Sequence, residues 1–226
     1  MNILVIVSHP DDEVLGCGGS ISRFARAGQD VYIAILSRGL GARYGEDQDV
    51  PEELLQAISR QSNTVAQQLG ARRLFLHDLP DNRFDTIPLL RIVKIIEDLV
   101  STVTPEIIIT HHGGDLNIDH RRVFQAAVTA TRPAGSALVR DLYSCEIPSS
   151  TEWAFQHTGH AFRPNVFIDI TDTLEEKVRA LQVYESETRT FPHPRSPEGV
   201  KVTAQRWGMV SGCRAAEAFE LIRSIR

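Results

Sequence analysis

Cysteine is scarce in this sequence, with three residues among 226. Cys17, Cys145 and Cys213 lie far apart and form no C-x-x-C pair. An odd and dispersed set of this kind argues against a disulfide framework and against a cysteine-rich metal site. We therefore interpret the three residues as buried or free thiols in a chain long enough to bury a core without disulfides.

Excess positive charge is also absent. The chain carries 24 lysine and arginine residues against 29 aspartate and glutamate residues, which gives a net charge of -5 and a pI near 5.9. Such a balance provides no general electrostatic attraction for nucleic acid or for an anionic membrane surface. We predict a small or neutral ligand, and neither nucleic acid nor a membrane as a partner.

Long hydrophobic runs are missing as well. The apolar run at residues 3–7 is too short for a membrane span or a signal-peptide core, and no basic stretch precedes it. We see no linker, internal repeat or low-complexity tract, and the hydrophobic content of 42% is ordinary for a globular protein. We expect one domain over residues 1–226 and a cytoplasmic location.

What the sequence does contain is an alternation of strand-like and helix-like segments. The strand-like runs are at 3–7, 31–36, 73–77, 106–110, 137–144 and 166–170. The helical patterns are at 13–28, 51–69, 88–102 and after Asp119. Short connections between such elements favour a parallel sheet covered by helices on both faces. The predicted fold class is α/β, a Rossmann-like three-layer α/β/α sandwich with a mainly parallel sheet.

In such a sheet, ligands bind at the carboxyl ends of the strands. The segments expected at this edge are the loop after the first strand, Ser37–Arg43, Asp78–Asp85 and the histidine-rich segment His111–His120. Residues 186–212 are rich in Arg, His, Pro and Gly, and we expect them to fold back over the site.

The first strand breaks onto His9-Pro10-Asp11-Asp12-Glu13. Acidic residues at a helix start are ordinarily explained by capping and the helix dipole. His9 and Asp12, however, lie three residues apart around a proline, and can converge as nitrogen and oxygen ligands of a metal. A catalytic zinc site takes three protein ligands and keeps one position open. The segment after the fourth strand offers five candidates for the third ligand: His111, His112, Asp115, Asp119 and His120.

Two stretches carry a family resemblance. The run from His9 to Glu13, followed by Gly16-Cys17-Gly18-Gly19, and the run from Gly114 to His120 resemble the PIG-L (LmbE-like) zinc-dependent de-N-acetylases. Two late segments are also similar to bacterial members: His193-Pro194-Arg195-Ser196 and Ala216-Glu217-Ala218-Phe219.

The resemblance implies a zinc ion held by His9, Asp12 and His120, with Asp11 as the general base. It also implies hydrolysis of the acetamide of an N-acetylated amino sugar, which releases acetate and a free amine. Relatives act on cofactor-thiol precursors, antibiotic intermediates, inositol lipids and sugar nucleotides, and the missing membrane segment disfavours the inositol lipid. Because relatives are often dimers or hexamers, we expect a homo-oligomer.

The chain departs from the family at Asn117, where many relatives have a histidine that assists the reaction. Asparagine can donate a hydrogen bond to an oxyanion but cannot serve as an acid. Our hypothesis is that Asp11 returns its proton to the leaving nitrogen, while Asn117 or His193 stabilises the oxyanion. The alternative for His193 is a loop histidine without a function between two prolines.

Arg43 and Asp81 are expected to bind sugar hydroxyls, since the equivalent positions in relatives do so. Arg43 is alternatively a solvated charge, and Asp81 a turn residue after a proline.

The sequence also bears on three rival functions. The glycines of Gly16-Cys17-Gly18-Gly19 do not make a dinucleotide-binding loop, because Ile21 stands where the third glycine of G-x-G-x-x-G is needed. A metal-dependent phosphoesterase is the stronger alternative, since clustered aspartates and histidines also hold two-metal sites. A non-catalytic sugar-binding relative is disfavoured because both the ligands and Asp11 are present.

Overall fold

The computed structural model describes residues 1–44, 50–133, 139–155 and 161–226. The side chain of Arg43 also falls outside this part of the chain. The strands are β1 (Asn2–Val7), β2 (Asp30–Ile35), β3 (Arg73–Leu76), β4 (Ile107–His111), β5 (Asp141–Cys145), β6 (Val166–Asp169) and β7 (Ala216–Ser224). The α-helices are α1 (Asp12–Arg26), α2 (Glu52–Gln68), α3 (Leu89–Val103), α4 (Ile118–Ala130), α5 (Leu174–Val183) and α6 (Pro197–Ser211). Short 3₁₀ helices are η1 (Gly41–Arg43), η2 (Phe84–Thr86) and η3 (Glu152–Ala154).

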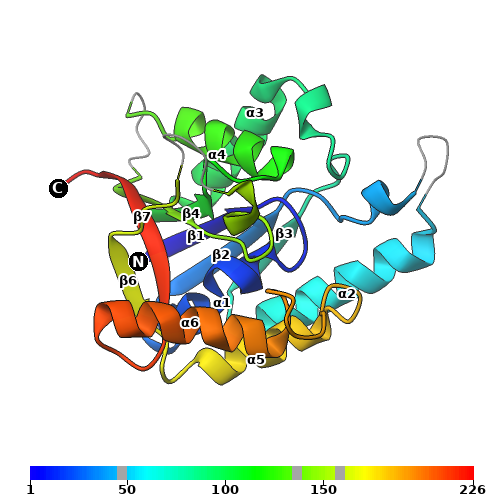
Figure 1. Ribbon diagram of the computed structural model, residues 1–226. Coiled ribbons are helices and arrows are strands. Elements are labelled where there is room, and N and C mark those ends of the chain that lie inside the picture. The colour runs from blue at the N-terminus through cyan, green and yellow to red at the C-terminus, as the bar shows by residue number, and fades with distance from the viewer. Residues whose placement is uncertain (45–49, 134–138, 156–160) are drawn as a thin grey trace.

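The strands of the described residues form one seven-stranded sheet in the order β3-β2-β1-β4-β5-β7-β6. The pairs from β3 through β5 are all parallel, whereas β7 pairs antiparallel with both β5 and β6. Figure 1 shows α3 and α4 on one face of the sheet and α1, α2, α5 and α6 on the other. The predicted α/β sandwich with a mainly parallel sheet is confirmed.

The central strand β1 explains why its sequence shows no polar alternation. Its side chains at Ile3, Val5 and Val7 pack into the core under α1, α2 and α5, and those at Leu4 and Ile6 pack into the core under α3 and α4. A strand buried on both faces is apolar at every position, which is typical of parallel sheets covered by helices. Because β1 lies between β2 and β4, the order of the strands reverses beside it. Open α/β sheets bind ligands at this reversal.

Helix α1 lies unusually close to its neighbours. A Cβ atom added at Gly16 would lie 2.6 Å from the Cys145 sulfur, and one at Gly19 would lie 2.8 Å from Ile170 Cδ1. These glycines therefore allow close packing of the helix that begins with Asp12, which gives them a role other than dinucleotide binding.

Some of the sequence-based boundaries were wrong. The strand predicted at 137–144 is observed from Asp141 to Cys145, and residues 134–138 lie outside the described part of the chain. Strand β7 and helix α5 were not predicted. Strand β7 begins with alanine and glutamate residues, which are depleted in strands, and its partners come from far away in the sequence. None of the helices in the described ranges is long and apolar enough to cross a membrane.

Candidate metal centre

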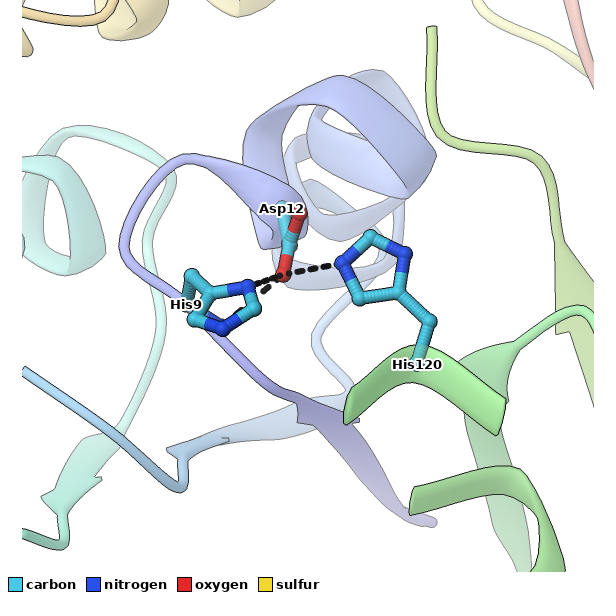
Figure 2. A group of neighbouring side chains, drawn as sticks. All are labelled: His9, Asp12 and His120. Atoms are coloured by element: carbon cyan, nitrogen blue, oxygen red, sulfur yellow. Dashed lines mark hydrogen bonds and ion pairs between the residues drawn. The ribbon is translucent and has the colours of Figure 1, made fainter. Parts of the chain in front are cut away.

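Three side chains meet where the first strand ends. His9 and Asp12 come from the turn between β1 and α1, and His120 comes from the first turn of α4. Asp12 Oδ2 lies 3.4 Å from His9 Nδ1 and 3.3 Å from His120 Nε2. Figure 2 shows both imidazole rings turned towards this carboxylate. The structure thus brings together the three residues that the resemblance implies as ligands, with the carboxylate and His120 almost completely buried.

These spacings fit a tetrahedral zinc site. Zinc binds nitrogen and oxygen ligands at about 2.0–2.2 Å, so neighbouring ligand atoms of a tetrahedron are about 3.4 Å apart. Both contacts of Asp12 Oδ2 have this length. Charge-assisted hydrogen bonds between nitrogen and oxygen are shorter, at about 2.7–2.9 Å. The donor set of two imidazoles and one carboxylate is therefore placed as a cation would require.

An outer carboxylate faces the second nitrogen of each imidazole. His9 Nε2 donates a hydrogen bond to Asp119 Oδ2 at 2.9 Å, and lies 3.2 Å from Asp81 Oδ1. His120 Nδ1 lies 3.1 Å from Asp115 Oδ1. In each ring the nitrogen that faces Asp12 is thus left to offer its lone pair to a metal. Metal-binding histidines commonly have such carboxylate partners, which set the tautomer and raise the basicity of the ligand.

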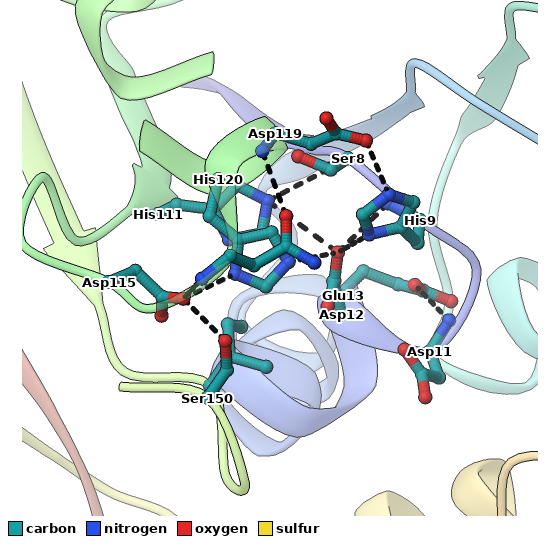
Figure 3. A network of polar contacts seen from close by, with 12 residues as sticks. Ser8, His9, Asp11, Asp12, Glu13, His111, Asp115, Asp119, His120 and Ser150 are labelled. Carbon is teal, nitrogen blue, oxygen red and sulfur yellow. Dashed lines mark hydrogen bonds and ion pairs between the residues drawn. The ribbon is translucent and has the colours of Figure 1, made fainter. Parts of the chain in front are cut away.

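The outer carboxylates are themselves held by hydrogen bonds. Asp119 accepts from the backbone N–H groups of Asn82 at 2.7 Å and Phe84 at 2.9 Å. Asp115 accepts from the hydroxyls of Ser150 and Thr151, the latter at 2.6 Å. Part of this network is drawn in Figure 3. These contacts link the turn after β5 and the loop before α3 to the two imidazoles.

The other two candidates for the third ligand lie elsewhere in the network. His111 Nε2 accepts a hydrogen bond from the backbone N–H of Ser8 at 2.8 Å, and its ring stacks on His120 with centroids 3.9 Å apart. Burial lowers the pKa of His111 to about 3, which keeps the ring neutral. His112 turns away and pairs with Glu220 at 2.7 Å. His111 Nε2 also lies 3.6 Å from Asp12 Oδ2, but its lone pair already accepts the hydrogen bond from Ser8 N. His111 therefore packs against the cluster as a neutral ring, and His112 lies outside the cluster.

The cluster has a strongly negative potential. Burial opposes the charged form of His9, but its contacts with Asp119, Asp12 and Asp81 outweigh burial and raise its pKa well above the ordinary value. In the same way burial opposes protonation of His120, while Asp12 and Asp115 raise its pKa to about 9. The potential that holds protons on these rings also favours a divalent cation, so protons and the cation compete for the same nitrogens.

Asp11 lies beside the cluster in an unusual backbone conformation. Its φ is 99°, in the left-handed region that few residues other than glycine adopt. Its carboxylate is buried, and Asp11 Oδ2 accepts a hydrogen bond from Arg195 Nη1 at 2.8 Å. Burial raises the pKa of Asp11 well above the ordinary value, Arg195 opposes this shift, and Asp12 and Glu187 add to it.

A pocket of about 140 Å³ opens beside this group of residues. Its lining consists of His9, Pro10, Asp11, Asp12, Arg38, Gly39, Leu40, Ala42, Ile58, Asp81, Asn82, Asn117, Glu187 and Arg195. Sequence reasoning did not single out four polar members of this set: Arg38, Asn82, Glu187 and Arg195. Arg195 belongs to one of the late segments that resemble the family. Glu187 and Arg195 both belong to residues 186–212, which were expected to fold back over the site, and both line the pocket.

The remaining predicted site residues are placed as follows. Asn117 lines the pocket, but its Oδ1 caps α4 by accepting from Asp119 N at 2.8 Å, and its Nδ2 donates to Asn82 Oδ1 at 2.9 Å. Asp81 also lines the pocket, and accepts from Ala42 N at 2.9 Å besides contacting His9. The side chain of Arg43 lies outside the described residues.

His193 is not among the described residues that line the pocket. Its Nδ1 accepts from Arg195 N at 3.1 Å, and its ring packs edge-on against Trp153 with centroids 5.4 Å apart. His193 therefore contacts the backbone of a pocket residue and does not itself face the pocket.

Comparison with known proteins identifies relatives over the whole chain. Diacetylchitobiose deacetylase of Thermococcus kodakarensis is 28% identical over 233 aligned positions, covering 99% of this chain and 84% of the relative. The 4-oxalmesaconate hydratase of Pseudomonas putida is 26% identical over 196 positions, covering 79% and 71%. The structure of N,N'-diacetylchitobiose deacetylase from Pyrococcus horikoshii matches with a TM-score of 0.76 at 20% identity, covering 98% and 83%.

The model of one protein family, described as PIG-L: GlcNAc-PI de-N-acetylase, matches residues 4–131. This range is more than half of the chain, and includes both segments that supply the three clustered side chains. The resemblance inferred from the sequence motifs is thereby confirmed. The chain belongs to the PIG-L family of metal-dependent de-N-acetylases.

Proposed function

We propose that this protein is a zinc-dependent N-deacetylase that hydrolyses the acetamide of an N-acetylated amino sugar or sugar conjugate, releasing acetate and a free amine. The observation that carries the proposal is the meeting of His9, Asp12 and His120, whose ligand atoms all lie within 4.8 Å of one another, with both contacts of Asp12 at the spacing of a tetrahedral site. The Asp11 carboxylate lies on the wall of the same pocket. Diacetylchitobiose deacetylases among the relatives support the substrate class.

In this proposal His9, Asp12 and His120 hold the zinc ion. Zinc at such a site supplies Lewis-acid polarisation of a carbonyl oxygen and makes water more acidic. Asp11 accepts the proton of the attacking water as general base and returns it to the leaving nitrogen. Its buried position supports the second step, because a carboxyl group with a raised pKa holds a proton more readily.

The developing oxyanion needs a donor from the chain. Asn117 is the better placed of the two predicted residues, since it lines the pocket and His193 does not. Its Nδ2 already donates to Asn82 Oδ1, so this bond must be exchanged for one to the substrate. Asp81 also lines the pocket and is proposed to bind a sugar hydroxyl, and Arg43 stays a prediction for the same task.

The test is acetate release from a panel of N-acetylated sugars, including N-acetylglucosamine, N,N'-diacetylchitobiose and a sugar nucleotide. We expect the zinc-loaded protein to deacetylate at least one of them. Asp11→Asn keeps the volume of the side chain but removes the base, and should lose most of kcat. Asp98→Asn, a matched change at an exposed position on α3, should leave kcat unchanged. An Asp11→Asn variant as active as the wild type would refute the assigned base.

Metal content separates the rival functions. One zinc per chain supports the deacetylase, whereas two metals with hydrolysis of a phosphate ester support the phosphoesterase. The metal count is informative because His9, Asp81 and Asp119 form a second group of side chains that could hold a metal ion. Reconstitution with Zn²⁺ and with Fe²⁺ identifies the active metal. Hydration of 4-oxalmesaconate without acetate release would instead match the hydratase relative.

We also propose that the protein forms a homo-oligomer. Three large apolar side chains of α6 are exposed: Val202, Met209 and Val210. Exposed apolar side chains on one helix are available for a contact between protomers, and large apolar patches are typical of protein interfaces. Light scattering on the purified protein measures the mass, and a monomer at micromolar concentration would contradict the proposal.

A further inference from the structure

Arg195 enters the pocket from a part of the chain beyond the family match. It lies between α5 and α6, 184 residues away from its partner Asp11 in the sequence. The guanidinium donates from Nη1 to Asp11 Oδ2 at 2.8 Å, and both residues line the pocket beside the metal cluster. This is the contact through which the late part of the chain reaches the proposed base.

Arg195 is itself fixed by its surroundings. Its Nε donates to Ser149 Oγ at 2.8 Å, and its Nη1 lies 4.0 Å from Glu187 Oε2. The backbone around it is held as well, because the next residue, Ser196, caps α6 by accepting from Gly199 N at 2.9 Å. A Cβ atom at Gly199 would lie 2.7 Å from Pro194 O, so the loop packs directly on the first turn of the helix. The guanidinium is thus presented from a rigid support.

The backbone of Asp11 is held by hydrogen bonds with Glu13, Val14 and Leu15, but its own segment does not stabilise its carboxylate. Its backbone is in the left-handed region at φ 99°, where a residue with a side chain is strained. Its immediate neighbours Asp12 and Glu13 are both buried acids, which repel a carboxylate. Removing one partner of a buried ion pair leaves an uncompensated charge. Without Arg195, the Asp11 side chain would therefore turn to another rotamer or towards water.

We propose that Arg195 is a positioning residue, whose guanidinium holds the Asp11 carboxylate in the orientation that faces the substrate. The inference rests on the proposed function, since the role of Asp11 as general base is part of that function. In this proposal the segment between α5 and α6 contributes a residue to the active site. A misplacement of about 1 Å in a reacting group can lower the rate about 100-fold.

The experiment compares Arg195→Ala, Arg195→Gln and Arg195→Lys with the control Arg189→Ala, each loaded with zinc. Arg189 lies in the same loop, and its Nη1 donates to the backbone carbonyls of Ser186 and Thr188 within that loop. We expect Arg195→Ala and Arg195→Gln to lower kcat about 10- to 100-fold with KM changed less than about threefold. Arg195→Lys should recover part of the loss, and added guanidinium salt should partly rescue Arg195→Ala. Arg189→Ala should match the wild type.

A double-mutant cycle tests whether Arg195 acts through Asp11. If it does, Arg195→Ala should cost little further activity in an Asp11→Asn background, because residues that act as one unit are not additive. Additive losses, or no loss in Arg195→Gln, would overturn the proposal. Thermal unfolding and zinc content of each variant show whether a loss of activity reflects unfolding, and Arg195→Lys supplies the comparison if Arg195→Ala does not fold.

The outcome is distinguishable from failure of the proposed function. If the wild type releases no acetate from any sugar of the panel, the proposed function fails, and the positioning role is then tested by crystal structures of the wild type and of Arg195→Gln. A changed Asp11 rotamer in the variant supports the positioning role. An unchanged Asp11 rotamer overturns it whatever the reaction.

Discussion

The first 131 residues and the remainder of the chain contribute to the site in different ways. The first part forms parallel strands β1 to β4, and its loops supply His9, Asp12 and His120 together with Asp11. The second part adds β5, the antiparallel β7, and helices α5 and α6, and supplies side chains that hold the first set in place. Asp11 is held by Arg195, and Asp115 by Ser150 and Thr151.

This difference indicates a division of labour. The carboxyl ends of parallel strands converge by the geometry of the sheet, so ligands placed there meet without further guidance. The partners in the second part come from connections whose course the sheet does not determine. The family match ends at residue 131, so it includes the ligands but not these partners. We therefore expect the first part to determine metal binding and catalysis, and the second part to hold these residues in place.

The largest effect should come from removing a ligand in the first part. His120→Ala leaves two protein ligands, and we expect metal affinity and kcat to fall by more than the roughly 10- to 100-fold loss that follows removal of an outer partner. His112→Gln is the matched control, since this nearby histidine pairs with Glu220 in the second part. Zinc content after dialysis and acetate release measure the two variants. Retention of zinc by His120→Ala would show that the cluster has been assigned incorrectly.

Away from the residues that contact the site, the second part should respond to mutation mainly through a change in stability. Lys177 and Glu217 form a buried ion pair at 2.6 Å, and the glutamate also accepts from the backbone N–H groups of Gly19 and Ser20 in α1. Breaking such a pair by Lys177→Met should lower the free energy of unfolding by about 3–5 kcal/mol. Urea unfolding measures it.

The double variant Lys177→Met with Glu217→Gln should recover part of that loss, since no buried charge is left unpaired. Zinc affinity of the folded protein should stay within about threefold of the wild type, because the pair does not contact the cluster. A large loss of affinity at unchanged stability would contradict the division between chemistry and support.

Glu13 contacts residues of both parts, and its contribution to the free energy of unfolding should depend on pH. Tyr184 of the second part donates to Glu13 Oε1 at 2.6 Å, and Asp11 N donates to its other oxygen at 3.1 Å. Burial raises the pKa of Glu13 from 4.5 to about 7, although the bond from Tyr184 opposes the shift. The folded state thus binds an extra proton between these values, and stability falls as the pH rises through this window.

The expected size is about 3 kcal/mol, lost between pH 4.5 and pH 8. Glu13→Gln removes the titration, so the difference in unfolding free energy between variant and wild type should grow in favour of the variant over this range. The measurement is urea unfolding of chelator-treated protein at several pH values. A difference that is constant with pH would show that Glu13 has an ordinary pKa.

The sequence predicted the first part of the molecule better than the second. The unbroken apolar run of β1 and the spacing of His9 and Asp12 are local features, so the sheet edge and two of the three clustered side chains were visible in the sequence. The choice of His120 among five candidates needed the family resemblance, because spacing alone does not say which side chain of a loop turns inwards. The contact of Arg195 with Asp11 joins residues 184 positions apart, and depends on how the last helices pack.

The smallest expected effects are those on zinc affinity of mutations around Asp115, where residues of the two parts are in contact. Asp115 belongs to the first part and faces His120 Nδ1 at 3.1 Å, but two of its hydrogen-bond donors, Ser150 and Thr151, belong to the second. Asp115→Asn should weaken zinc binding about 10- to 100-fold, as loss of an outer carboxylate partner does. Competition with a chromophoric chelator measures the affinity.

Ser150→Ala keeps the carboxylate of Asp115 and removes one donor to it. We expect a loss of zinc affinity of a few fold, in the same direction as Asp115→Asn but smaller, because Thr151 and the backbone N–H of Asn117 still hold the carboxylate. A zinc affinity equal to that of the wild type would mean that the second part holds Asp11 in place but does not contribute to metal binding. A measurable loss would mean that the outer shell of the metal site extends across the end of the family match, so that the ligands alone do not define the site.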